Sequence, residues 1–259
     1  MQRHNAARER AEVFAWFRQA AERGDPYAQF NLALLYQKGE GVARDERLAF
    51  DWMIRAARQG LAAAQNHLGA MYGKGHGTAR NPRLAARWFA RAAGQGDAAA
   101  QQNLGQLYRK GRGLPQSDPL AFGWFYRAAE QGLASAQNLV GESYLLGQGT
   151  APSHPLAMAW FRKAARQGHA PAQLNLALMY HRGDGVDADD VQALCWFRQA
   201  AAQGSPVAQR ALGLAYAHGR GVARDPARAV AWLERAAAAG DGEARCALDS
   251  LRTARRRGA

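Results

Sequence analysis

Residues 26–61 read PYAQFNLALLYQKGEGVARDERLAFDWMIRAARQGL, and this stretch decides the fold. Its first half gathers small and apolar side chains on one face of a helix, at Ala28, Leu32, Ala33 and Tyr36. Gly39 and Gly41 follow, and glycine readily adopts the left-handed conformation that ends helices. The segment therefore predicts a helix over about 26–38 and a tight turn after it.

The second half of the stretch begins with a residue that can cap a helix. Asp45 recurs every 36 residues as another side chain able to accept a backbone N–H bond, the full set being Asp45, Asn81, Ser117, Ser153, Asp189 and Asp225. Pro82 and Pro226 follow their caps directly, where proline suits the first helical turn. A second helix is therefore predicted from about residue 46 to the closing Gly60.

Tryptophan shows how far this unit extends along the chain. All seven tryptophans are 36 residues apart: Trp16, Trp52, Trp88, Trp124, Trp160, Trp196 and Trp232. A fixed period of this size is typical of repeat architectures. We predict an all-α protein, an α/α solenoid of six full 36-residue helix–turn–helix repeats with a half-repeat at each end. It would form one domain over residues 1–252, followed by a frayed basic tail at 253–259.

Apolar residues also recur in fixed columns of the second helix. The alanine column runs from Ala49 to Ala229, and the column after tryptophan holds Met53, Phe89, Phe125, Phe161, Phe197 and Leu233. Such columns would be buried continuously between stacked repeats. We therefore expect the tryptophans to be core residues that bind no ligand.

Composition limits the partners and the cellular context. The chain of 259 residues has a net charge of +13, mostly from arginine, which favours an anionic partner, although a solvated surface would also explain it. Cys195 and Cys246 occupy different columns, so no disulfide is expected. We find neither a leader peptide nor an apolar run long enough to span a membrane. The sequence as given predicts a cytoplasmic monomer; a leader removed earlier would make the protein periplasmic or secreted.

The consensus of the unit resembles a known family. The pattern A-x-x-x-L-G-x-x-Y-x-x-G-x-G, followed by D-P-x-x-A-x-x-W-F-x-R-A-A-x-Q-G, is similar to the Sel-one-like repeat, a relative of the tetratricopeptide repeat. Departures are mild: Val140 replaces Leu, Ala33 and Ala177 replace Gly, and Ala239 replaces Gln. The resemblance implies a solenoid that binds proteins as an adaptor, regulator or scaffold. An immunity protein against a secreted toxin is one such role.

Analogy with tetratricopeptide arrays implies a concave groove lined by the first helix of each repeat. The groove residues that this implies are Phe30, Asn31, Leu34, Lys38, His67, Lys74, Gln102, Asn103, Gln106, Arg109, Lys110, Asn138, Glu142, Leu145, Asn175, His181 and Arg182. Residues of the sixth repeat in the same columns are Arg210, Ala211, Leu214, Ala217 and His218. We expect a protein or peptide partner to bind there, and acidic groups on it would suit the basic columns.

Two rows stand out among these columns. Asparagine recurs at Asn31, Asn103 and Asn175, and a cation recurs at Lys38, Lys74, Lys110 and Arg182. An amide row beside a cation row could hold an extended backbone and a carboxylate. Two simpler explanations remain open: cations before the terminating glycine meet the negative end of the helix dipole, and the asparagines are merely solvated.

The fourth repeat departs from this polar pattern. Leu139, Leu145 and Leu146 occupy outward-facing columns, which indicates an apolar patch within the groove unless a slight helix rotation buries them. Both alternatives are compatible with the sequence.

No catalytic, metal or cofactor site is expected. The seven histidines lack metal-ligand spacing, and the acidic segment 183–190 lacks the terminal Glu of a calcium loop. A cationic column on the second helix (Arg55, Arg91, Arg127, Lys163 and Arg235) is expected to be a solvated stripe. We therefore favour a non-enzymatic protein-interaction module. An electrostatic binder of a polyanion, such as an acidic polysaccharide or the less favoured nucleic acid, is the alternative.

Overall fold

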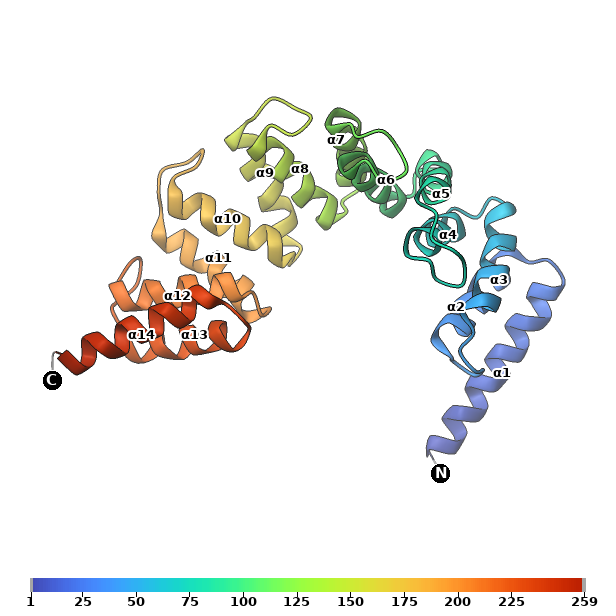
Figure 1. Cartoon of the computed structure of the whole chain (residues 1–259), viewed down its shortest axis with the longest axis horizontal. Coiled ribbons are helices and arrows are strands. Elements are labelled where there is room, and N and C mark those ends of the chain that lie inside the picture. Colours follow the sequence, from blue (N-terminus) through green and yellow to red (C-terminus); the bar gives the residue numbers. More distant parts are fainter. Residues whose placement is uncertain (1, 258–259) are drawn as a thin grey trace. The chain divides into compact units, whose positions relative to one another are not determined.

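The structure is a computed structural model that describes residues 2–257, with side chains from residue 9 to residue 253. Within that range the chain forms helices joined by short turns, as Figure 1 shows, and no strand. The fourteen described helices are α1 (Gln2–Glu22), α2 (Pro26–Lys38), α3 (Glu46–Arg58), α4 (Ala62–Lys74), α5 (Pro82–Gly94), α6 (Ala98–Lys110), α7 (Asp118–Glu130), α8 (Ala134–Leu146), α9 (His154–Arg166), α10 (Ala170–Arg182), α11 (Asp190–Ala202), α12 (Pro206–His218), α13 (Pro226–Ala238) and α14 (Gly242–Arg257).

The even-numbered helices are the first helices of the repeats, and the odd-numbered helices are the second. The most extensive contacts join the two helices of one repeat, such as α2 with α3 and α12 with α13. Helix α1 is a lone second helix and α14 a lone first helix. The predicted all-α solenoid with a half-repeat at each end is confirmed.

The chain divides into two compact units, Met1–Gln131 and Gly132–Ala259, and each is described by itself. The first unit contains α1 to α7, and the second contains α8 to α14. The single domain predicted for residues 1–252 stays a prediction.

Capping fixes where the second helix of each repeat begins. Asp45 accepts hydrogen bonds from the backbone N–H groups of Arg47 and Leu48, both at 2.9 Å. The side chains of Asn81, Ser117, Ser153, Asp189 and Asp225 cap their helices in the same way. These bonds satisfy donors that lack an intrahelical partner, so the predicted capping column is confirmed.

The two glycines after each first helix have different structural roles. Gly75 ends α4 with φ of 82°, and its N–H donates to the carbonyl of Met71. Gly77 has φ of 65°, and a Cβ atom there would lie 1.9 Å from the carbonyl oxygen of Glu46. The second glycine is therefore required because the turn of one repeat rests against the second helix of the preceding repeat.

The core lies between the helices of each repeat and contains mostly alanine, leucine and phenylalanine. Phe125 is fully buried, and its ring packs against Gly105 of α6. A Cβ atom on Gly105 would lie 2.6 Å from the ring. The small Gly or Ala column of the first helix thus leaves room for the aromatic column of the second.

Buried glutamines of the first helices accept hydrogen bonds from exposed glutamines that follow the second helices. Gln65 donates to the carbonyl of Ala57 at 3.2 Å, and it accepts from the amide of Gln95 at 2.7 Å. The same side-chain hydrogen bond, from the later glutamine to the earlier one, occurs in five pairs: Gln59 to Gln29, Gln95 to Gln65, Gln131 to Gln101, Gln167 to Gln137 and Gln203 to Gln173. In the sixth repeat Ala239 replaces the donor, and the Oε1 of Gln209 is buried without a hydrogen-bond partner among the described residues.

The tryptophans are less uniformly buried than the sequence predicts. Trp88 and Trp160 are buried, but Trp16 on α1 is 63% exposed, because no preceding first helix covers it within the described chain. The remaining four, Trp52, Trp124, Trp196 and Trp232, are half-buried. The prediction of a uniform tryptophan core is therefore wrong for Trp16 and only partly correct for these four.

The cationic column of the second helices is also not a freely solvated stripe. The guanidinium of Arg55 lies 4.3 Å from the centroid of the Trp52 ring, and that of Arg91 lies 4.6 Å from Trp88. Arg127, Lys163 and Arg235 stack in the same way on Trp124, Trp160 and Trp232. Each cation thus covers the ring three residues before it.

The last helix differs from the other first helices. Asp249 and Arg252 replace the small residue and the tyrosine, both are exposed, and Arg252 pairs with Glu234 of α13 at 3.1 Å. Helix α14 continues to Arg257, so the expected frayed tail at 253–259 is helical through that residue. Alanine and arginine are good helix formers, which explains the extension. The side chains after Thr253 lie outside the described ones.

Candidate protein-interaction site

The face of the even-numbered helices, predicted to line a groove, contains contacts between neighbouring repeats. The ring of Phe30 meets that of His67 with centroids 5.4 Å apart. Asn103 donates to the side-chain carbonyl of Asn66 at 3.0 Å, and Asn175 donates to that of Asn138 at 3.1 Å. In each case one residue contacts the residue 37 positions further along. The pairs fill the space between neighbouring first helices.

These contacts change the interpretation of the asparagine row. Asn31 donates to the carbonyl of Tyr27, while Asn103 and Asn175 are engaged with neighbouring repeats. Asn138 is only 4% exposed and also donates to Glu142 at 2.8 Å, so little of its side chain is open to a partner, and its role in partner binding stays a prediction. Each asparagine of the row thus makes one hydrogen bond within the protein, and its role in binding a partner stays a prediction.

The apolar patch expected in the fourth repeat is mostly buried. Leu139 is buried, and Leu145 is partly buried against the core that contains Met158 and Phe161. Only Leu146 is strongly exposed. Of the two alternatives that the sequence left open, burial holds for Leu139 and largely for Leu145.

The cations of the predicted groove fall into two groups. Lys38, Lys74, Lys110 and Arg182 are exposed in the last turns of their helices, where the helix dipole favours them. Arg109 instead stacks on the ring of Phe125 and donates to Gln106. Gln102 and Leu34 are half-buried.

Burial perturbs one histidine of this face. Desolvation lowers the pKa of His67, while a hydrogen bond to the backbone of Ala63 and the charge of Asp97 raise it by less. His67 therefore favours the neutral form more than a solvated histidine does.

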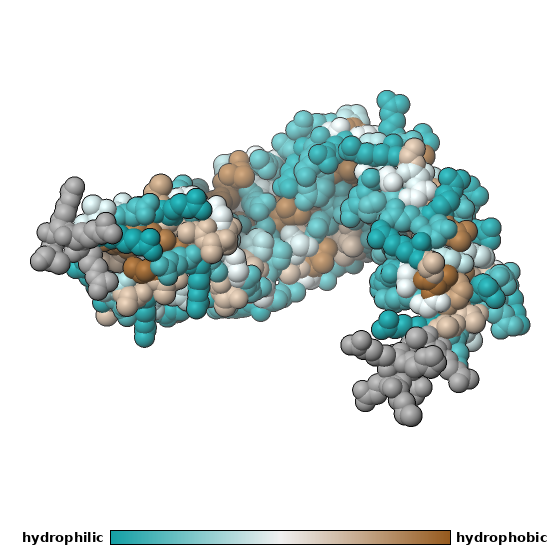
Figure 2. All heavy atoms as spheres, turned by 60° about the horizontal axis from the view of Figure 1, so that its bottom comes forward, coloured by the Kyte–Doolittle hydropathy of each residue, from teal (hydrophilic) through white to brown (hydrophobic). Residues whose placement is uncertain are grey.

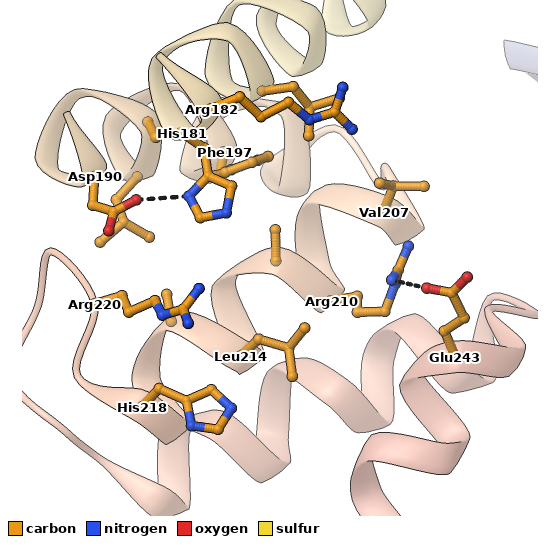
Figure 3. A pocket seen from close by; sticks show the side chains of 15 residues that line it. His181, Arg182, Asp190, Phe197, Val207, Arg210, Leu214, His218, Arg220 and Glu243 are labelled. Carbon is orange, nitrogen blue, oxygen red and sulfur yellow. Dashed lines mark hydrogen bonds and ion pairs between the residues drawn. The ribbon is translucent and has the colours of Figure 1, made fainter. Parts of the chain in front are cut away.

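A pocket of about 510 Å³ opens within the second unit, as Figure 3 shows. It lies between α10, α11 and α12, with contributions from the turn after α12 and from α14. Its lining residues are Leu178, His181, Arg182, Asp190, Ala193, Leu194, Phe197, Val207, Arg210, Ala211, Leu214, Ala215, His218, Arg220 and Glu243. The volume suits one or two side chains of a partner.

The pocket exists because two columns hold small residues in the sixth repeat. Ala211 occupies the column of His67 and Asn103, whose side chains pair with the preceding repeat. Ala215 occupies a column that holds Leu35, Met71, Leu107, Ser143 and Met179 in the other repeats. The missing side-chain volume leaves a depression with Phe197 and Leu214 in its wall.

The charges around the pocket are only partly compensated. His181 Nδ1 lies 2.6 Å from Asp190 Oδ1, and Arg210 donates to Asp241 at 2.9 Å and to Glu243. Glu243 is therefore ion-paired, whereas Asp190 contacts a histidine that is charged only when protonated. The remaining cationic or basic lining residues are Arg182, His218 and Arg220, and among the described residues they have no ion-pair partner.

The structure brings together only a small part of the predicted groove set. His181 and Arg182 line the pocket, as do Arg210, Ala211, Leu214 and His218 of the same columns. Sequence reasoning missed Asp190, Phe197, Val207, Arg220 and Glu243 as lining residues. The sequence does contain a signal for the pocket: alanine occurs at 211 and 215, in columns where the other repeats have larger side chains.

Hydropathy is distributed unevenly over the visible surface. Figure 2 shows hydrophilic side chains over most of that face, with apolar side chains exposed in patches between them. Among the described helices, none combines the length and hydropathy that a bilayer crossing requires.

The repeat geometry places the chain in a family. The Sel1 repeat model matches residues 14–25, 26–61, 62–97, 98–133, 134–169, 170–205 and 206–241, so this chain belongs to the Sel1 repeat family. Sel1 repeat proteins are protein-interaction modules and generally non-catalytic scaffolds.

Solved structures with the same fold include two bacterial proteins. A protective antigen of uropathogenic Escherichia coli strains with an SLR fold is 37% identical, with a TM-score of 0.86 over 92% of this chain. The match spans 51% of that protein, about half its length. A Sel1 repeat protein from Oxalobacter formigenes is 32% identical, with a TM-score of 0.80 over 89% of this chain and 92% of its own. No curated protein matches.

Proposed function

We propose that this protein is a non-catalytic interaction module that binds a segment of a partner protein in the pocket between α10, α11 and α12. The observation behind the proposal is the pocket itself, which interrupts a face otherwise filled by contacts between repeats. Concave sites with apolar walls and a few polar groups are where proteins hold ligands. Membership of a family of protein-interaction modules supports a protein as the occupant.

The remainder of the predicted groove offers fewer free groups. An amide N–H group donates a hydrogen bond within the protein at Asn31, Asn103 and Asn175. The guanidinium of Arg109 stacks on an aromatic ring. A partner that contacts this face elsewhere would compete with those interactions. The pocket is therefore the anchor point of the proposed interaction.

Affinity purification with a pocket-filled variant tests the proposal. Ala215→Met introduces the residue found in the same column at Met71 and Met179, so the fold should tolerate it. Proteins retained by the wild type are identified by mass spectrometry, and direct binding of each purified candidate is measured by calorimetry. A partner should be lost from Ala215→Met and retained by Ala99→Met, the same change on an exposed surface. Equal binding by all three proteins would contradict a role of the pocket.

An immunity role is a special case of this proposal, in which the partner is a secreted toxin. The same purification distinguishes it, because the recovered partner would inhibit growth when it is expressed alone. Rescue of growth by the wild type but not by Ala215→Met would support this role. A partner without toxicity would reject it.

Binding of a polyanion is the second candidate, and the net charge of +13 favours it. It predicts a steep loss of affinity with salt, because each neutralised anionic group releases counterions. Heparin and single-stranded DNA can serve as probes between low and physiological salt. Affinity that changes little over that range would exclude the polyanion and leave the pocket model intact.

A further inference from the structure

We propose that the pocket recognises a carboxylate next to a bulky apolar side chain of the partner segment. The inference rests on the proposed function and specifies the chemistry of its occupant. The carboxylate can come from Asp, Glu or a free C-terminus, since each presents the same two oxygens.

The apolar half of the pocket is formed by residues from three helices. Phe197 of α11, Leu178 of α10 and Leu214 of α12 all line the pocket, and Ala215 adds little side-chain volume to it. Leu178 and Leu214 are only partly buried, and Val207 at the edge is exposed. An apolar side chain of the partner would cover this surface and remove it from water.

The basic lining residues come from different elements. Arg182 ends α10, His218 ends α12, and Arg220 belongs to the turn between Gly219 and Gly221. Figure 3 shows the side chain of Arg220 extending into the open space of the pocket, between Asp190 and Leu214. Arginine binds carboxylates through two parallel N–H donors, which makes it suited to this anion.

Helix ends alone do not account for this arrangement. The helix dipole favours basic residues at the positions of Arg182 and His218, but Arg220 lies beyond the end of α12. Among the described residues Asp190 contacts His181 and Glu243 contacts Arg210, and no ion pair joins either acid to Arg220. The guanidinium donors of Arg220 beside an apolar depression are therefore available to a partner that is both anionic and apolar.

Two bead-bound libraries of random peptides provide the test. Both are attached through their N-termini; one has free C-terminal carboxylates, and the other has C-terminal amides. Selection with the wild-type protein should enrich Leu, Phe or Trp next to Asp or Glu in the amidated library. In the free library, peptides that end with such an apolar residue should also be enriched if a C-terminus is the source of the carboxylate.

Variants then assign the enriched peptides to the pocket. The best peptide is labelled with fluorescein, and its affinity is measured by anisotropy. Arg220→Gln should weaken binding about tenfold or more, since a charge-assisted hydrogen bond is lost. Arg112→Gln provides the matched control, because Arg112 occupies the same turn position between two glycines in the third repeat and lies outside the pocket. Ala215→Met should abolish binding while leaving the circular dichroism spectrum unchanged.

The outcomes separate this inference from the function on which it rests. If the wild type enriches peptides that lack carboxylates, and Ala215→Met loses them, the pocket binds peptides but the inferred chemistry is wrong. If Arg220→Gln and Arg112→Gln bind the best peptide equally, the carboxylate contact is wrong as well. If no peptide is enriched by the wild type, both the peptide-binding function and the inference fail.

Discussion

Ala239 leaves the buried side-chain carbonyl of Gln209 without a donor, whereas the five preceding repeats place a glutamine at that position. A buried acceptor without a partner costs about 1–3 kcal/mol. The defect lies where α12 meets the end of α13, in the repeat that also contributes Arg210 and Leu214 to the pocket.

Restoring the glutamine should stabilise the protein. We expect Ala239→Gln to raise the free energy of unfolding by about 1–2 kcal/mol, because its amide can donate to Gln209 Oε1. Urea denaturation followed by circular dichroism measures the change. Gln95→Ala is the reciprocal variant: it creates the same defect at Gln65 and should destabilise by a similar amount. Unchanged stability in both variants would mean that these amide bonds contribute nothing net.

The cation stacked on tryptophan should contribute measurably to stability. Arg91→Ala removes a guanidinium 4.6 Å from the Trp88 ring and should cost about 0.5–1 kcal/mol. Arg87→Ala is the control, because Arg87 is an exposed arginine of the same helix without a ring contact among the described residues. Thermal unfolding of both variants is the measurement. Equal effects would show that Arg91 is only a solvated surface charge.

Two glycines in neighbouring helices should respond oppositely to alanine. Gly105→Ala places a methyl group against the buried ring of Phe125 and should destabilise by about 1–3 kcal/mol. Gly123 of α7 has open space around it, so Gly123→Ala should stabilise by about 0.5–1 kcal/mol through helix propensity. Chemical denaturation distinguishes the signs. Stabilisation by both changes would mean that Phe125 moves aside at little cost.

The perturbed histidine predicts how stability varies with pH. Because burial lowers the pKa of His67, the folded protein binds its proton more weakly than the unfolded chain does. The contribution of neutral His67 to stability is complete above about pH 6.5, the pKa of histidine in the unfolded chain. It is lost as the pH falls through that pKa toward the lower pKa of the folded protein. His67→Asn should flatten the dependence of the melting temperature on pH between about 7 and 5.

The slope with pH is the informative quantity in that experiment, because the substitution also removes the ring contact with Phe30. Burial likewise lowers the pKa of His169, so some slope should remain in the variant. His154→Gln, at an exposed position, provides the control and should keep the full slope of the wild type. A slope unchanged by His67→Asn would contradict the assignment.

The sequence could predict the helices because each boundary has a local signal. Asp45 caps one helix and Gly75 ends another, and both effects depend on backbone groups close in sequence. The degree of burial was harder to predict, because it depends on which helix lies alongside. Trp16 follows the same pattern as Trp88, yet it has no preceding first helix to cover it within the described chain.

The candidate site could be predicted only in part for a related reason. Repeat columns indicate which residues share a face, and His181, Arg182 and Leu214, which they group, all line the pocket. They do not show whether a side chain such as that of Asn138 is hydrogen-bonded to a neighbouring repeat. The pocket depends on the small side chains of Ala211 and Ala215. It also depends on Glu243 of the last half-repeat, and that half-repeat does not follow the repeat pattern.

The close approach of Gly77 to the carbonyl of Glu46 has a consequence for how such a chain can evolve. A turn that touches the preceding repeat cannot gain or lose a single residue without displacing the helix that follows. Adding or removing a whole unit would keep this contact, and the six full matched repeats all have 36 residues. Recombination between repeats would then add or remove whole units, whereas single substitutions such as those at Ala211 and Ala215 would change the shape of the pocket.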